Sequence, residues 1–486
     1  MSPEEVARAH QFREGFTLVD YGEVGLPVFR LTIEAITTTQ RTLPTIHEFV
    51  MRCLSLGESR EETIARMLGL RPEVVVGAVN ALVAEGLVAR QSGSSDLQSF
   101  GLTEAGEARL AVESIEVPQE EMLVIDYDGI RRLPIRLAGA AVVKAAELKS
   151  NGALEIRPYP AEAPAIDTLA IPDITRVVRR QRGEDFRRTV LALKRIVRRN
   201  NVFSEAVALV FAADKGGEVQ VAFAIDGKLS ELHERAFAEN GGPKKMGFLK
   251  ALSESDPKNQ IDAIVGKQTA KAFPLRADVI ALRRAQSDGE AAVRNTIAAA
   301  ERGGKGNPAS AALAMAQQNL ATVETMLANY PVRPMEVYEQ KDLLDEALDG
   351  AKTRLLITSN ALNPTLLHGG VLRQIDNLIG FDVAVRIQIP AAPPSDAGKN
   401  EVRYDPRSEL AKRFHRGSPV LMESQKRSIY FLIKDRGLAV VTNRPFFGDP
   451  FRRSGFMFVS GTVIRDPEMV EKLYQKLTEP AVRKRG

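Results

Sequence analysis

The chain has 486 residues, of which 44% are apolar and 26% charged, and this balance is typical of a folded protein with three or four domains. A single cysteine, Cys53, excludes an internal disulfide framework and a zinc site built from cysteines. Tryptophan is absent and aromatic residues make up only 6%, which argues against a large stacking platform for single-stranded nucleic acid. The net charge of +4 is small, so the positions of the basic residues matter more than their sum.

The N-terminal sequence predicts no export and no membrane association. Residues 1–10 are charged and have no apolar core of the kind found in signal peptides. No apolar run approaches the length of a membrane span. We therefore expect a cytoplasmic protein. The five histidines are scattered without metal-ligand spacing, so neither a metal nor another cofactor is expected.

The first third of the chain predicts strands followed by a small helical domain. Residues 16–36 alternate around Gly22 and Gly25, which predicts two strands joined by a turn. Residues 45–56 form the first predicted helix, a second ends near Met67, and a third extends over 72–85, with Pro72 at its first position. A β-hairpin is expected after Gly86. This order resembles the winged helix-turn-helix domains of bacterial repressors.

That resemblance implies a third helix placed in the major groove of DNA. Arg71 and Asn80 are the polar residues that this helix would offer to DNA, and Arg90, beside the hairpin, would contact phosphates. The helix contains no basic residue, so base readout is expected to be weak. The alternative is a domain of this fold that docks a protein or dimerises.

The densest charge in the chain lies in the predicted central domain. From Arg176 to Arg199 there are ten Arg or Lys residues against two acids. The spacing of Val190, Leu193 and Val197 predicts the apolar stripe of a helix whose remaining surface is basic. Such a helix predicts salt-dependent phosphate contacts, the alternatives being a solvated face or an acidic partner. The expected contact residues are Arg179, Arg180, Arg182, Arg187, Arg188, Lys194, Arg195, Arg198 and Arg199.

Two long helices are predicted in the next part of the chain. The first covers residues 277–301, and the second follows Ser310. In the second helix, apolar residues recur at steps of three and four from Leu313 to Leu327. This pattern predicts a helical hairpin that serves as a dimer contact or as an arm between the two halves of the chain.

The C-terminal third alternates helices with apolar strands, which predicts a layered α/β unit. The predicted helices are 342–352 and 371–379, and the predicted strands are 354–358, 383–389, 429–433 and 438–442. The segments 334–363 and 428–470 together resemble one unit of the phospholipase D-like superfamily.

In that superfamily a His-x-Lys-x4-Asp pattern carries phosphodiester chemistry without a metal. If Asp435 is taken as the aspartate, Ser428 occupies the histidine position and Tyr430 the lysine position. Asn443 is what remains of the Ser-x-Asn turn that follows. The resemblance therefore implies a phospholipase D-like fold that has lost its active site.

We expect an α/β multidomain chain, α+β overall. The expected units are a winged helix with N-terminal strands (1–115), a central α/β domain (116–270), a helical hairpin (271–330) and a degenerate phospholipase D-like domain (331–486). The expected function is a non-catalytic adaptor that binds double-stranded DNA in a bacterial antiphage-defence or DNA-processing system, beside a partner ATPase or nuclease. The alternatives are a metal-independent nuclease that works as a homodimer, with His415 as the candidate nucleophile, and a transcription regulator.

Overall fold

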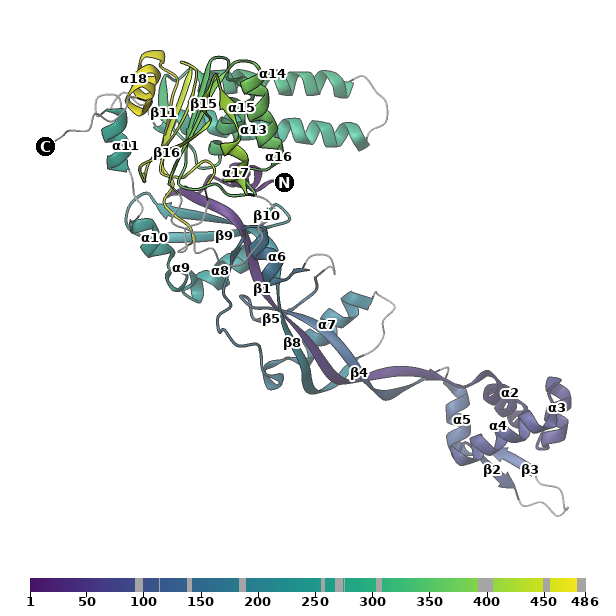
Figure 1. The fold of residues 1–486 in the computed structure, drawn as a ribbon. Coiled ribbons are helices and arrows are strands. Elements are labelled where there is room, and N and C mark those ends of the chain that lie inside the picture. The colour runs from purple at the N-terminus through teal and green to yellow at the C-terminus, as the bar shows by residue number, and fades with distance from the viewer. Residues whose placement is uncertain are drawn as a thin grey trace.

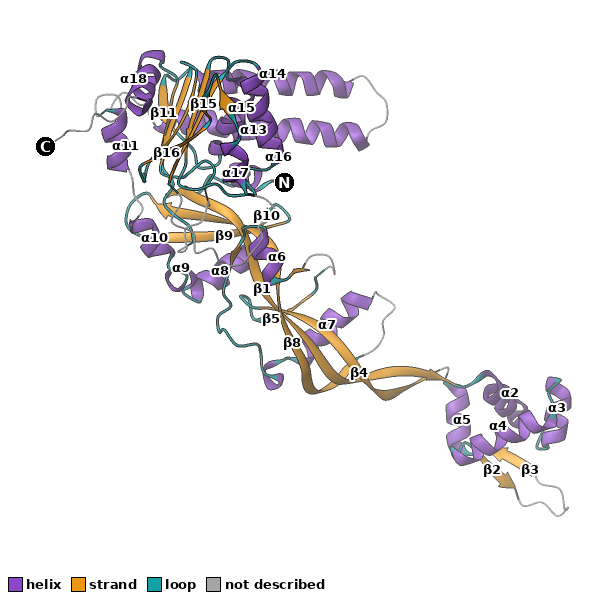
Figure 2. Cartoon of the chain, viewed as in Figure 1, coloured by secondary structure: helices purple, strands orange, loops and turns teal. Residues whose placement is uncertain are grey.

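The computed structural model describes residues 1–91, 99–112, 114–137, 142–182, 189–254, 258–266, 274, 276–302, 308–391, 405–448 and 455–478. These residues form an α+β multidomain chain with helices and several sheets (Figure 2). The molecule is elongated (Figure 1). A C-terminal α/β unit lies at one end, a long twisted sheet forms the middle, and a small helical module, which we call the tip module (residues 43–112), lies at the other end.

The central sheet contains eight strands, in the order β10-β9-β8-β1-β4-β5, with β6 and β7 paired to β8 and β1. Its strands are β1 (Phe16–Thr42), β4 (Ser114–Asp128), β5 (Leu133–Ile135), β6 (Val142–Val143), β7 (Leu154–Glu155), β8 (Val190–Ala213), β9 (Val219–Ile225) and β10 (Lys228–Leu229). β1 pairs antiparallel with β4 on one side and with β8 on the other. Where only these three strands remain, the sheet becomes a narrow ribbon that ends at the tip module (Figure 1).

The two strands predicted over residues 16–36 are one strand, so the prediction of a turn near Gly25 is wrong. A Cβ atom on Gly25 would lie 2.4 Å from a side-chain carbon of Leu148. Glycine is required here because helix α6 (Ala145–Ser150) packs directly onto the strand, not because the chain reverses. Pro27, two residues further on, is paired with Phe203 of β8 within the sheet.

The tip module contains three helices, a two-stranded hairpin and a last short helix. They are α2 (Thr45–Ser55), α3 (Glu61–Leu68), α4 (Pro72–Ala84), β2 (Val88–Gln91), β3 (Ser99–Leu102) and α5 (Glu104–Ala111). The three predicted helices are thereby confirmed. The module is inserted between β1 and β4, so the expected division at residue 115 separates two paired strands.

Shorter helices cover the central sheet, and two long ones project from the C-terminal unit (Figure 1). The covering elements are α1 (Pro3–Ala9), a 3-10 turn (Ile166–Thr168), α7 (Ile171–Arg182), α8 (Glu231–Glu239), α9 (Gly242–Lys245) and α10 (Phe248–Glu254). α11 (Lys258–Val265), which follows them in the chain, packs against the C-terminal unit. The predicted helical hairpin is confirmed as α13 (Arg276–Arg302) and α14 (Pro308–Ala328).

The C-terminal unit is built on a seven-stranded mixed sheet, in the order β11-β19-β18-β17-β12-β13-β16. Its elements are β11 (Val332–Pro334), α15 (Glu339–Gly350), β12 (Arg354–Thr358), α16 (Gly369–Gly380), β13 (Ala384–Pro390), α17 (Pro406–Ala411), β14 (Phe414–His415), β15 (Ser418–Pro419), β16 (Leu421–Ser424), β17 (Tyr430–Lys434), β18 (Leu438–Thr442), β19 (Gly461–Ile464) and α18 (Pro467–Thr478). The strands and helices expected from the apolar pattern are confirmed to within three residues.

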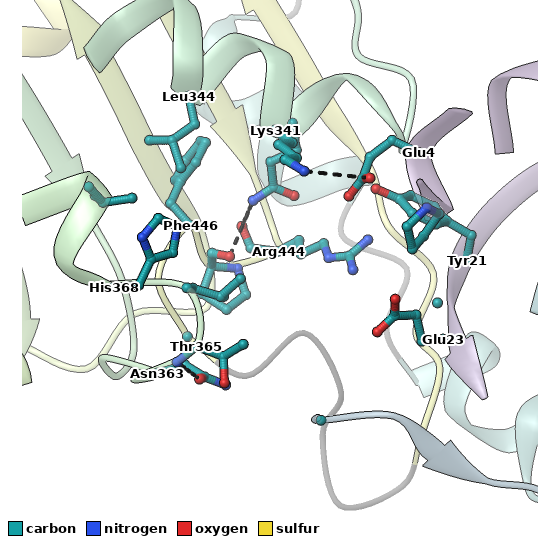
Figure 3. A pocket seen from close by; sticks show the side chains of 18 of the residues that line it. Glu4, Tyr21, Glu23, Lys341, Leu344, Asn363, Thr365, His368, Arg444 and Phe446 are labelled. Carbon is teal, nitrogen blue, oxygen red and sulfur yellow. Dashed lines mark hydrogen bonds and ion pairs between the residues drawn. The ribbon is translucent and has the colours of Figure 1, made fainter. Parts of the chain in front are cut away.

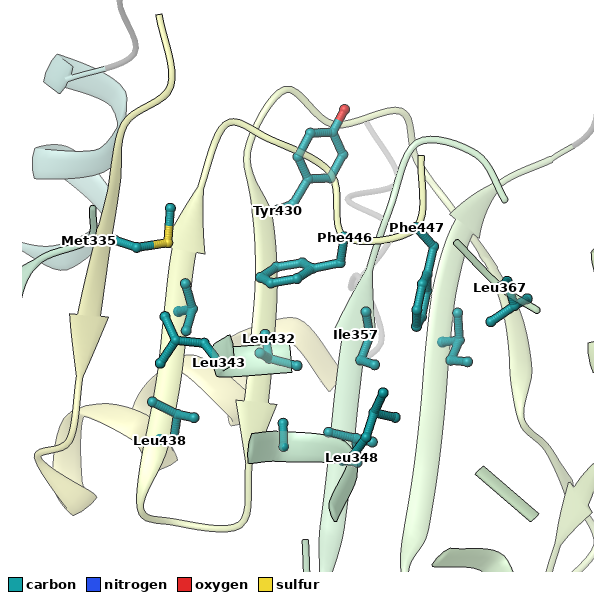
Figure 4. Packing of buried hydrophobic residues seen from close by; sticks show 14 of the residues in the cluster. Met335, Leu343, Leu348, Ile357, Leu367, Tyr430, Leu432, Leu438, Phe446 and Phe447 are labelled. Carbon is teal, nitrogen blue, oxygen red and sulfur yellow. The ribbon is translucent and has the colours of Figure 1, made fainter. Parts of the chain in front are cut away.

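Each face of this sheet has its own apolar core. α15 and α16 cover one face, where Leu343 and Leu348 of α15 lie over Ile357 and Leu432 (Figure 4). α11 and α18 cover the other face. The first core extends into the base of the central sheet, where it includes Leu18 of β1 and residues of β8 and β9. The C-terminal unit and the base of the central sheet are thus packed together.

Within the described ranges no single helix is both long and apolar enough to cross a bilayer. Only α3 and α4, which meet at an angle of 120°, satisfy the criteria of length and composition, and they do so only as a pair.

Candidate nucleic-acid interface

The three residues that the sequence assigns to DNA in the tip module lie on its surface. Arg71 is the N-cap residue of α4 and is exposed. Asn80 is exposed on the outer side of α4, and Arg90 is exposed on β2. The structure therefore places one exposed cation at the start of α4 and one on the hairpin.

The charge of the tip module opposes a large electrostatic contribution to DNA binding. Residues 43–112 contain six Arg and nine Asp or Glu, a net charge of −3. The outer side of α4 presents Glu73, Val76 and Asn80, which are all exposed. Because non-specific affinity for DNA comes mainly from cations at phosphates, we expect such a surface alone to contribute little to any binding of duplex.

The predicted basic helix is wrong from Val190 onward. α7 extends to Arg182, and the chain from Val190 is strand β8, paired with β1. Between Val190 and Arg198 the register of that pairing shifts at three places, which lie on β1 between Thr32 and Ile33, between Glu34 and Ala35, and between Ile36 and Thr37.

Those shifts explain the helical pattern in the sequence. Each leaves one extra residue in β8, namely Leu191, Lys194 and Val197. Val190, Leu193 and Ile196 therefore point to one face at steps of three instead of two, and all three pack in the core that α7 covers. A strand with a bulge at every third residue imitates the period of a helix, and Val197, assigned to the apolar stripe, is 48% exposed.

Two of the expected phosphate contacts on β8 are already neutralised. Lys194 Nζ lies 3.1 Å from Glu34 and 2.7 Å from Glu120, and Arg195 Nε lies 2.7 Å from Glu34. Hydrogen bonds from Arg195 and Lys194 hold the pKa of Glu34 below its usual value. The carboxylates on β1 and β4 thus compete directly with phosphate for these two cations.

Four other cations of the predicted set have no acidic partner among the described residues. Arg179 and Arg180 are exposed on α7, and Arg198 and Arg199 are exposed on β8. Arg179 donates to the Thr189 hydroxyl at 3.0 Å and Arg198 to the Asn200 side chain at 3.2 Å, both neutral groups. We call these four residues the free arginine set. The side chain of Arg182 and all of Arg187 and Arg188 lie outside the described residues.

The residues at the phospholipase D-like positions support the fold. Ser428 donates to Gln260 at 3.2 Å, and the buried Tyr430 donates to the Arg427 carbonyl at 3.0 Å. Asn443 is buried and accepts from the Ser460 amide at 3.0 Å. Asp435 lies at the opposite end of β17, in the turn to β18.

Asp435 has the most extensive hydrogen bonding of these residues. Its carboxylate accepts from the amides of Lys352, Thr353 and Arg354, and from the Thr353 hydroxyl, at 2.7–3.1 Å. Its φ of +52° is unusual for a residue other than glycine. Although burial opposes ionisation, these donors lower the pKa of Asp435. The side chain thereby fixes the start of β12.

A cavity of about 400 Å³ separates the C-terminal unit from the start of β1 (Figure 3). Arg444 extends across it from the C-terminal unit, and its guanidinium lies 3.3 Å from the buried carboxylate of Asp20 in β1. Asp20 also accepts from the Met457 amide at 2.8 Å. Sequence reasoning missed this pair because its members are more than 400 positions apart and neither belongs to a local motif.

Asp20 predicts a specific dependence of stability on pH. Burial raises the pKa of Asp20 to about 6, although Arg444 and two amides lower it. Because the folded state holds this proton more tightly than the unfolded state, protonation of Asp20 stabilises the fold fully below about pH 4. This stabilisation, about 2–3 kcal/mol, is lost as the pH rises to about 6. The measurement is urea denaturation of the wild type and of Asp20→Asn across pH 4–7. An identical pH dependence of the free energy of unfolding in both proteins would contradict this prediction.

In the described part of the chain, no three His, Cys, Asp or Glu side chains are placed to share a metal ion. His415, the candidate nucleophile of the nuclease alternative, lies on the separate β14–β15 hairpin. Its Nε2 atom is 3.0 Å from the carboxylate of Asp382.

Comparison with known proteins yields only distant likenesses. No protein-family model matches the chain, and no curated protein sequence matches it. Among solved structures, the phospholipase D family member Nuc from Salmonella typhimurium aligns at 13% identity over 30% of this chain and 88% of its own, with a TM-score of 0.21. NucT from Helicobacter pylori aligns at 14% over 30% and 92%, with a TM-score of 0.21.

The third likeness is to TrmBL2, described as an archaeal chromatin protein with a novel mode of DNA binding. It aligns at 17% identity over 34% of this chain and 58% of its own, with a TM-score of 0.20. At these scores none of the three structures carries an argument about the present chain, so its function has to be argued from its own residues.

Proposed function

We propose that this chain is a non-catalytic adaptor that binds double-stranded DNA, with the free arginine set as its principal phosphate contacts. The observation that carries the proposal is the difference between two groups of cations on α7 and β8. Lys194 and Arg195 are paired with carboxylates, whereas the four free arginines are exposed and have no acidic partner among the described residues. Unpaired surface guanidinium groups suit phosphate geometry and release counterions on binding.

In this proposal the tip module is a winged helix with a secondary role on DNA. Arg71 and Arg90 would contact phosphates, and Asn80 is the polar side chain that α4 would offer to a base. The net charge of −3 supports a weak contribution and leaves the outer side of α4 free to dock a protein. A partner ATPase or nuclease of an antiphage-defence or DNA-processing system would be such a protein.

The non-catalytic part of the proposal rests on the phospholipase D-like positions. Ser428, Tyr430, Asp435 and Asn443 each make a hydrogen bond to a neighbouring helix, strand or loop. None of them is a histidine that could be phosphorylated. The alternative of a homodimeric nuclease would need His415, which is paired with Asp382 away from these positions.

Binding of a random-sequence duplex across a salt series tests the proposal. Replacing all four free arginines with glutamine is expected to make the slope of log K against log salt shallower by about 3.6, at roughly 0.9 per lost phosphate contact. The matched control is Lys194→Gln with Arg195→Gln, which removes cations already held by Glu34 and should change the slope much less. A loss of about 1.8 in the control, half that of the four-residue variant, would mean that pairing with carboxylates does not decide which cations reach DNA.

A further inference from the structure

A second cavity lies on the face of the C-terminal sheet opposite the core shown in Figure 4. It has a volume of about 400 Å³, within the range of small-molecule sites. α11, the chain leading into β17, and the last turns of α18 enclose it. Of the degenerate phosphodiesterase positions, Ser428 lines it, whereas Tyr430, Asp435 and Asn443 do not.

The rim of this cavity is positively charged without compensation. Lys426, Arg427 and Lys476 line it, and no Asp or Glu is among the described residues that do so. The Nε atom of Arg427 is buried and has no hydrogen-bond partner in the described part of the chain. Burial lowers the pKa of this guanidinium, and no carboxylate opposes the effect. A buried donor without a partner is costly, and an anion in the cavity would supply the partner.

The floor of the cavity is apolar. It consists of Ile264, Ile429, Phe431, Leu473 and Leu477. The Arg427 guanidinium lies 5.9 Å from the centre of the Phe431 ring, so cationic and aromatic groups meet at one point of the wall. Such a floor favours an apolar or aromatic body over a bare inorganic anion, because burying apolar surface contributes most of the affinity.

We propose that this cavity binds a small amphipathic organic anion, which has one phosphate or carboxylate at Arg427 and Lys476 and an apolar body on Phe431 and Leu473. The proposal does not depend on DNA binding, because the free arginine set lies on the central sheet and not in the C-terminal unit. A ligand here would bridge α11, α18 and β17, and would therefore stabilise the packing of both helices on the sheet.

Calorimetric titration of the full chain tests the proposal with four probes. Adenosine monophosphate combines an aromatic body with phosphate, and octanoate combines an aliphatic body with carboxylate. Octan-1-ol and inorganic phosphate supply the apolar part and the anion alone. At least one amphipathic anion should bind with a Kd below roughly 1 mM, and the two separate probes should bind much more weakly. Which of the two anions binds distinguishes a nucleotide from an acyl ligand.

Variants then locate the site. Arg427→Met should weaken binding of the anion about tenfold, because one charge-assisted contact is lost. Lys476→Met, at an exposed position, should have the same effect for the same reason. Lys472→Met, on the same helix but outside the cavity, should leave it unchanged. The proposal is overturned if neither amphipathic anion binds at roughly 10 mM, or if the three variants behave alike. Binding of phosphate as strong as that of the amphipathic anions, or displacement of the anion by duplex DNA, would also overturn it.

Discussion

Replacing Glu339 with glutamine is expected to lower the free energy of unfolding by about 3–5 kcal/mol, the usual cost of leaving buried charges without their partner. The Glu339 carboxylate lies between Arg333, at 2.8 Å, and Arg283, and all three side chains are less than 10% exposed. Arg283 belongs to α13 and Arg333 to β11. The substitution should therefore loosen the helical hairpin from the C-terminal unit as well as lower stability.

The pKa of Glu339 gives the same prediction a dependence on pH. Burial opposes ionisation, but the charges of Arg283 and Arg333 outweigh it and hold the pKa at about 2. Because the pKa is depressed in the folded state, the stabilisation is present above about pH 4.5 and is lost as the pH falls towards 2. Denaturation in urea measures the loss. The control is Glu48→Gln, which breaks an exposed ion pair with Arg52 and should cost less than about 1 kcal/mol. Equal effects of the two substitutions would contradict the account.

Replacing Asp435 with alanine is expected to cost about 2–3 kcal/mol, since three backbone amides and one hydroxyl lose a charged acceptor. Asp435→Asn should cost less, because an amide oxygen can still accept some of these bonds. The measurement is the urea midpoint of each variant, followed by circular dichroism. An alanine variant as stable as the wild type would show that Asp435 is not the anchor of β12, and would reopen the question of a catalytic role.

Most secondary structure of the C-terminal unit follows from its sequence because local pattern and tertiary environment agree there. The strand at 354–358 has the apolar run Leu355–Ile357 at its centre and is buried in the middle of a sheet, as such runs usually are. The ribbon is different. Three bulges place Val190, Leu193 and Ile196 on one face, a helical spacing that long-range pairing with β1 overrides. Pairing of strands that are more than 150 residues apart leaves no signal in a local window.

The candidate interface was only partly accessible from sequence for a related reason. Counting Arg and Lys located the basic segment, but whether a cation is available to phosphate depends on its neighbours across the sheet. Glu34 and Glu120 lie far from Lys194 in sequence and are brought to it only by the pairing of β1 with β4 and β8. Asp20 and Arg444 are also far apart in sequence and are brought together only by the fold. The apolar floor beneath Arg427 likewise includes residues of α11 and α18 that are distant from Arg427 in sequence.

The central claim is that the chain holds DNA without cutting it, and one measurement tests both halves. Purified protein is titrated against a random duplex between about 50 and 200 mM salt, and the same samples are then run on a gel for cleavage, with and without a chelator. The account predicts binding that weakens steeply with salt, with a slope set mainly by the free arginine set, and DNA that remains intact. Cleavage that survives the chelator, or binding that is insensitive to salt, would contradict it.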